Sequence, residues 1–184
     1  MTIDFDKALK TQLIQSLELE KYQWIIKNVR PMDVSKEKEF QRVYDGFYDV
    51  RRNEEWRKAY FCYFEEIKYK PDISFEMILK DLNNRLPKTS VEPSFSSKIL
   101  ATLNTQMPIW DSRVLRALGI DKEWNKIRTL DNAVAIYGKI CDWYRDYMKS
   151  DESREIINKF DYYFSDYQSI SSVKKIDYLL WCIG

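Results

Sequence analysis

The stretch Thr89-Ser-Val-Glu-Pro-Ser-Phe-Ser-Ser-Lys-Ile-Leu-Ala-Thr-Leu-Asn-Thr-Gln-Met-Pro-Ile-Trp-Asp-Ser-Arg-Val-Leu-Arg-Ala-Leu-Gly119 decides the fold that we expect for this chain. It predicts two short helices joined by an elbow. Pro93 and Pro108 mark the boundaries, because a proline keeps the residue before it out of the helical region. Ser94 or Ser96 can cap the first helix, since a serine oxygen accepts a hydrogen bond from a free amide at a helix start.

The second helix of this stretch has its own start and stop signals. Asp111 can cap its start, and Gly119 suits the left-handed conformation that often ends a helix. This arrangement predicts Lys98 in the first turn of one helix and Asp111 at the start of the next, 13 positions later. An elbow between them could bring an amine and a carboxylate into one cleft.

A lysine and an aspartate placed together, as predicted for Lys98 and Asp111, could catalyse a reaction. The positive end of a helix dipole and partial burial both disfavour a charged lysine. A neutral amine is the nucleophile of Schiff-base chemistry, and a nearby carboxylate can stabilise positive charge or move a proton. The structural alternative is equally concrete, since first-turn lysines are usually solvated and an aspartate before an apolar run is usually a cap.

The segments Pro93-Ser-Phe-Ser-Ser-Lys98 and Pro108-Ile-Trp-Asp-Ser-Arg-Val114 resemble the helix-hairpin-helix DNA glycosylase superfamily, nearest to its 8-oxoguanine glycosylase-like branch. In that family a Pro-Gly-x-Gly-x-Lys hairpin delivers a lysine nucleophile, and a Pro-x-x-Asp or Pro-x-Asp segment delivers an aspartate. The resemblance covers about residues 90–120. It implies that Lys98 is the nucleophile and Asp111 the catalytic aspartate.

The resemblance also implies contacts with DNA, for which the candidate residues are Ser94, Ser96, Ser97, Arg113 and Arg116. The hairpin departs from the family pattern, because two serines stand where the family has glycines. Glycines let backbone amides approach a phosphate closely.

Beside the predicted aspartate stands Trp110, which could stack on a base turned out of the duplex. It could instead hold the elbow in the core, and we favour the core.

Composition bounds the fold class and the compartment. The 184 residues include only four glycines and five prolines, which disfavours a turn-rich β fold. No segment alternates at period two for long enough to predict a strand, so we expect an all-α protein. We expect a single all-helical domain over 1–184, with one lobe from about 1–86 plus the C-terminal helices and a hairpin region over 87–130. The net charge of +1 exerts no general pull on nucleic acid. The acidic N-terminus and the lack of a long apolar run predict a cytoplasmic protein that does not bind membranes.

Two absences limit the chemistry. The chain has no histidine, which excludes Ser-His-Asp arrangements and His-ligated metal sites. Cys62, Cys141 and Cys182 are widely spaced and odd in number, which argues against a zinc site, an iron–sulfur cluster or a disulfide framework. We expect no metal and no cofactor, and lysine, carboxylates and tyrosine remain as reactive groups.

The remainder of the chain shows helical periodicity. We expect helices to start at Asp33, Asn53, Ser74, Asp131 and Ser171 or Ser172. An aromatic stripe at helical spacing could stack on bases, but its periodicity favours the core. The stripe consists of Trp56, Tyr60, Tyr63, Phe64 and Ile67.

These observations lead to one hypothesis and its alternative. The hypothesis is a DNA base-excision glycosylase, with a strand-nicking lyase step, that acts on double-stranded DNA. Lys98 attacks the sugar of a base turned out of the duplex, since base chemistry cannot be done inside the stack, and Asp111 assists. The alternative is a non-catalytic helical module that binds DNA or a protein partner.

Overall fold

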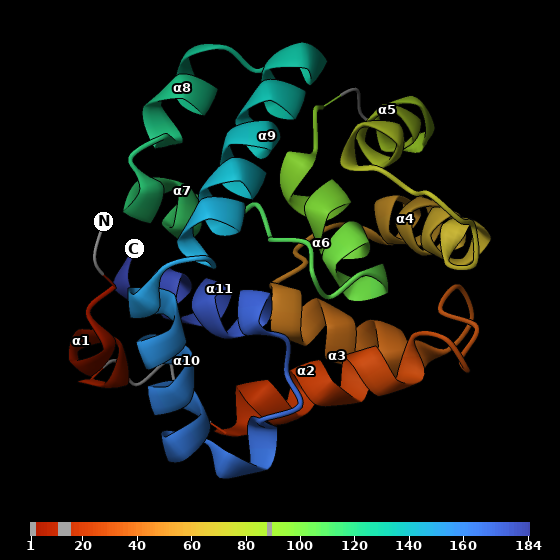
Figure 1. Cartoon of the computed structure of the whole chain (residues 1–184). Coiled ribbons are helices and arrows are strands. Elements are labelled where there is room, and N and C mark those ends of the chain that lie inside the picture. The colour runs from red at the N-terminus through yellow and green to blue at the C-terminus, as the bar shows by residue number, and fades with distance from the viewer. Residues whose placement is uncertain (1–2, 11–15, 88–89) are drawn as a thin grey trace.

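The computed structural model describes residues 3–10, 16–87 and 90–184, and all regular secondary structure in these ranges is helical (Figure 1). The elements are α1 (Phe5–Lys10), α2 (Ser16–Asn28), α3 (Lys38–Tyr48), α4 (Glu54–Ile67), α5 (Phe75–Arg85), α6 (Pro93–Leu103), α7 (Ser112–Leu118), α8 (Asp121–Lys126), α9 (Leu130–Tyr147), α10 (Asp151–Tyr163), the 3-10 turn η1 (Ser165–Tyr167) and α11 (Ser172–Ile183). The all-α prediction is confirmed. Within these ranges no helix has the length and apolar character needed to cross a membrane.

Several helix starts fall where side-chain capping predicts them. The side chain of Asn53 accepts a hydrogen bond from the amide of Trp56 at the start of α4, and Ser74 does the same for Met77 in α5. Ser171 caps α11. Each side chain satisfies an amide that has no partner within its helix. The local sequence was therefore enough to predict where these helices start.

Two predicted starts are wrong because a different residue provides the boundary. Helix α9 begins at Leu130, and Thr129 rather than Asp131 is its cap. Helix α3 begins at Lys38 instead of Asp33. The Asp33 carboxylate bonds to the amide and hydroxyl of Ser35, which forms a local turn that competes with a helix start.

The start of α6 also differs from the prediction, with a consequence for Lys98. The helix begins at Pro93, which suits the first helical position because its missing amide has no helical partner there. Ser94 and Ser96 therefore lie inside the helix and cap nothing. Lys98 is the sixth residue of α6 and lies in its second turn, so the dipole at the helix start acts on it less than predicted.

The core is dominated by aromatic side chains from α3 and α4. Phe40, Tyr44, Tyr60 and Phe64 are fully buried, and the hydroxyls of Tyr44 and Tyr60 lie 2.8 Å apart in a hydrogen bond. Tyr60 also donates to the carbonyl of Phe95 in α6, at 3.2 Å. The aromatic stripe is buried throughout, so the prediction that it forms core is confirmed.

The two helices of the hairpin contact different parts of the molecule. Helix α6 packs against α5 and α2, whereas α7 packs against α11 and α8. Helix α11 also contacts α1 and α10 (Figure 1). The hairpin thus joins two groups of helices, and its elbow lies where they meet. Thr89, at the start of the stretch quoted above, lies outside the described residues.

Candidate active site

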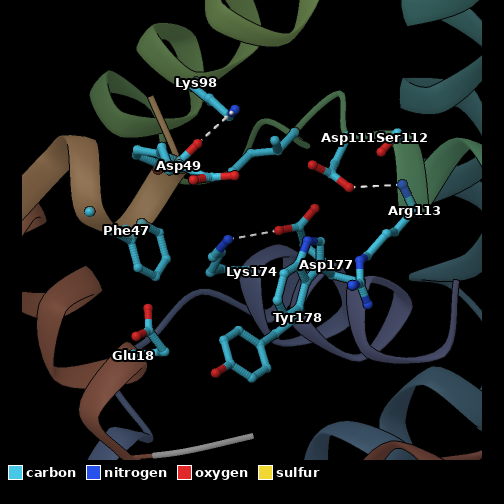
Figure 2. Close-up of a pocket in the computed structure, with 14 residues that line it drawn as sticks. Glu18, Phe47, Asp49, Lys98, Asp111, Ser112, Arg113, Lys174, Asp177 and Tyr178 are labelled. Carbon is cyan, nitrogen blue, oxygen red and sulfur yellow. Dashed lines mark hydrogen bonds and ion pairs between the residues drawn. The ribbon is translucent and has the colours of Figure 1, made fainter. Parts of the chain in front are cut away.

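A cavity of about 540 Å³ opens where the end of α3, the middle of α6, the start of α7 and the face of α11 meet (Figure 2). Its lining consists of Glu18, Gly46, Phe47, Tyr48, Asp49, Lys98, Ile109, Asp111, Ser112, Arg113, Lys174, Asp177, Tyr178 and Trp181. Both residues predicted to be catalytic, Lys98 and Asp111, line this one cavity.

Lys98 reaches the cavity as a nearly buried amine that is 8% exposed. Its Nζ donates to the carbonyl of Tyr48, at the C-terminal end of α3, at 3.2 Å, and lies 4.9 Å from the ring centroid of Phe95. It forms no ion pair within the described part of the chain. Burial lowers the pKa of Lys98, against the opposing charges of Asp111 and Asp49. The amine therefore loses its proton more easily than a solvated lysine.

The side chain of Asp111 is held in place by a hydrogen bond from a backbone amide. It caps α7, and its Oδ1 accepts a hydrogen bond from the amide of Arg113 at 2.8 Å. Gly119 ends the same helix in the left-handed conformation, with a φ of 71°. Both predicted boundaries of α7 are confirmed. The cap fixes one carboxylate oxygen of Asp111 and leaves the group at the wall of the cavity (Figure 2).

Ser97 stabilises the elbow between α6 and α7 through hydrogen bonds of its side chain. Its hydroxyl donates to the carbonyl of Ser94 and accepts from the amide of Trp110, both at 2.9 Å, and the residue is 0% exposed. Lys98 follows Ser97 in the chain, and Asp111 follows Trp110. One hydroxyl therefore couples the positions of the two groups at the cavity.

The other side chains proposed to contact DNA lie in varied settings. Ser94 is half-buried, while Ser96 is buried and donates to the carbonyl of Glu92 at 2.9 Å. The guanidinium of Arg113 lies 4.7 Å from the ring of Trp181 and lines the cavity.

Arg116 is exposed and bonds to the carbonyl of Gly184. Trp110 is buried, with its ring 5.2 Å from that of Trp124, so the core interpretation of this residue is confirmed.

The structure adds a buried ion pair that sequence reasoning missed. Lys174 and Asp177, both on α11, lie 2.7 Å apart and line the cavity, at 8% and 4% exposed. The hydroxyl of Tyr144 donates to the other oxygen of Asp177 at 3.3 Å. Burial raises the pKa of Asp177, and the charge of Lys174 opposes that effect. A lysine and an aspartate at i and i+3 on a helix whose second half is apolar are the signal that could have found them.

Charge in the cavity is mixed. Its lining carries three basic side chains and four carboxyl groups: Lys98, Arg113, Lys174, Glu18, Asp49, Asp111 and Asp177. Such a lining suits a polar ligand with both donors and acceptors. In the described ranges, no three or more potential metal-ligating side chains come together.

Comparisons of the chain with models of protein families, with curated proteins and with solved structures gave no match.

Proposed function

We propose that this protein is a DNA base-excision glycosylase with a lyase step, in which Lys98 is the nucleophile and Asp111 assists. The observation that supports the proposal is the shared cavity: a buried amine that forms no ion pair with any described residue lines the same space of about 540 Å³ as a carboxylate. Cavities of about 300–1,000 Å³ are typical of sites for small organic groups. The group in this case is a base turned out of the duplex.

The chemistry requires Lys98 to react as its neutral amine, a form that burial favours by lowering the pKa of this residue. Nζ attacks C1′ of the nucleotide, the bond between C1′ and the base breaks, and its electron pair leaves with the base, which takes up a proton. The attacking nitrogen loses a proton as the sugar ring opens, and a protonated imine forms between Nζ and C1′. Burial favours the first step, because it favours the unprotonated form of the amine.

Asp111 acts on the charge that this reaction develops. A carboxylate at the cavity wall stabilises positive charge on the sugar and can accept a proton from the attacking nitrogen. The cap on α7 keeps the carboxylate in place. In this proposal, exposed basic residues outside the cavity contact the DNA phosphates. Arg116, on α7, is one of these residues.

The test is trapping of the imine. Incubation with an abasic-site duplex and borohydride, which delivers hydride to the imine carbon, should give a covalent protein–DNA adduct. Lys98→Ala and Lys98→Arg should both abolish the adduct, and Lys58→Ala on the exposed side of α4 should leave it unchanged. A full-strength adduct in Lys98→Ala would remove Lys98 from the mechanism.

Asp111→Asn isolates the charge of Asp111, because an asparagine oxygen can still cap α7. We expect about 10²-fold slower adduct formation, in the range of a lost general acid–base group, with little change in melting temperature. An unchanged rate would assign Asp111 to capping alone.

A second candidate function is a non-catalytic helical module that binds DNA or a protein partner. It is favoured by two observations: the Lys98 amine already bonds to the carbonyl of Tyr48, and the hydroxyls of Ser96 and Ser97 are buried. A mobility-shift assay separates the two functions. Salt-sensitive binding without base release or adduct would support a DNA-binding module, and no DNA binding would leave a protein-interaction module.

A further inference from the structure

Among the described residues, the Lys174–Asp177 pair keeps a donor and an acceptor position that no hydrogen bond fills, and both residues line the cavity. The Lys174 ammonium has three N–H donors, of which one serves Asp177 at 2.7 Å. A carboxylate has about four acceptor positions, and Asp177 uses one for Lys174 and one for Tyr144. Both residues line the cavity (Figure 2).

The surroundings of the pair suit a flat ring. Phe47 and Tyr178 line the same cavity, and Figure 2 shows them on different sides of Lys174. The Lys174 Nζ lies 5.3 Å from the ring centroid of Phe47. Aromatic walls give stacking energy to any planar ligand, and hydrogen bonds at its edge then select among such ligands.

We propose that Lys174 and Asp177 select the extruded base by its pairing edge, and that they take bases in which a ring carbonyl stands next to a ring N–H. Lys174 donates to the carbonyl and Asp177 accepts from the N–H. Hypoxanthine, uracil and guanine carry this lactam edge. This inference rests on the proposed function and names the substrate class of the same cavity.

Adenine and cytosine carry the opposite order at that edge. Their exocyclic amino group is a donor where a lactam has its carbonyl, and their ring nitrogen is an acceptor where a lactam has its N–H. The amino group would face the Lys174 ammonium, and the ring nitrogen would face the Asp177 carboxylate. Because the proposed function places the sugar beside Lys98, the inference takes the base to enter the cavity with one orientation of this edge. Each mismatch leaves a buried polar group unpaired, which is the strongest source of discrimination.

The first test uses the unmodified protein and three probes. Duplexes carry hypoxanthine, 1-methylhypoxanthine or adenine opposite an abasic spacer, so that none of them has a pairing partner to lose. A fluorine on the sugar slows base release, and fluorescence anisotropy gives the affinities. We expect hypoxanthine to bind about tenfold or more tightly than both others, as for a bidentate base contact. Equal affinities would overturn the inference.

The second test changes the pair. In Lys174→Met and in Asp177→Asn the preference for hypoxanthine over adenine should fall to less than about threefold, with folding checked by thermal melting. A preference that persists in both folded variants would assign the selection to other residues.

The adduct on an abasic duplex separates this inference from the proposed function, because that substrate has no base to select. An adduct without base preference would overturn the inference alone. Preference without an adduct would uphold the selection and overturn the catalytic role of Lys98.

Discussion

The cavity holds two buried lysines, one on each side, in contrasting surroundings. On the α6 side, Lys98 bonds to a backbone carbonyl and has no ion-pair partner within the described residues. On the α11 side, Lys174 pairs with Asp177 at 2.7 Å. Both residues are 8% exposed, so burial is the same and the counter-ion differs.

Under the proposed function, this difference gives the two lysines different roles. A buried amine without a counter-ion favours its neutral form, which is nucleophilic. A buried ammonium held by a carboxylate keeps its charge and serves as a hydrogen-bond donor. We therefore assign reaction to the α6 side and recognition to the α11 side.

The largest expected effect comes from breaking the pair on α11. Lys174→Met leaves Asp177 buried without its partner and should lower the free energy of unfolding by about 3–5 kcal/mol, as is typical for half of a buried ion pair. The double variant Lys174→Met/Asp177→Leu should recover most of that loss, because an apolar pair of similar size is often neutral. Urea unfolding measures both variants. A loss below about 1 kcal/mol in the single variant would show that the pair is effectively solvated.

A smaller effect is expected at the elbow that holds the α6 side. Ser97→Ala leaves the buried amide of Trp110 without an acceptor and should lower the free energy of unfolding by about 1–3 kcal/mol. The matched control is Ser94→Ala in the same helix, where we expect a change within about 0.5 kcal/mol. Urea unfolding again provides the measurement. Equal effects in the two variants would show that the Ser97 hydroxyl does not stabilise the elbow.

The smallest effect is a change of stability with pH at Lys98. Because burial lowers the pKa of Lys98 in the folded state, the unfolded chain binds more protons between that lowered value and the ordinary value of 10.5. The free energy of unfolding of the unmodified protein, relative to Lys98→Met, should therefore rise with pH across this window and stay level below it. Urea unfolding of both proteins at a series of alkaline pH values measures the difference. A difference that falls as pH rises would mean that the folded state favours the ammonium.

Much of the fold could be predicted from the sequence because its signals are local. Helical periodicity and capping side chains identified the starts of α4, α5, α7 and α11, and the aromatic stripe of α4 was correctly assigned to the core. The starts of α3, α6 and α9 were missed, because several residues nearby could serve as caps. Local turn formation by Asp33 and the preference of Pro93 for the first helical position decided between them.

Only half of the candidate site could be predicted from the sequence. Lys98 and Asp111 belong to one motif, so their spacing pointed to a shared cleft. Lys174 and Asp177 lie more than 60 residues further on, and the tertiary packing of α11, including its contacts with α7, brings them to the cavity. The buried role of Ser97 also depends on the fold of the elbow, because a sequence shows a hydroxyl and not its partners.

The most direct test of the contrast between the two lysines is to locate the borohydride-reduced adduct in the chain. The unmodified protein is trapped on an abasic-site duplex, digested, and sequenced by mass spectrometry. The account predicts a sugar remnant on Nζ of Lys98 and none on Lys174. A remnant on Lys174, or on another amine with Lys98 unmodified, would contradict it.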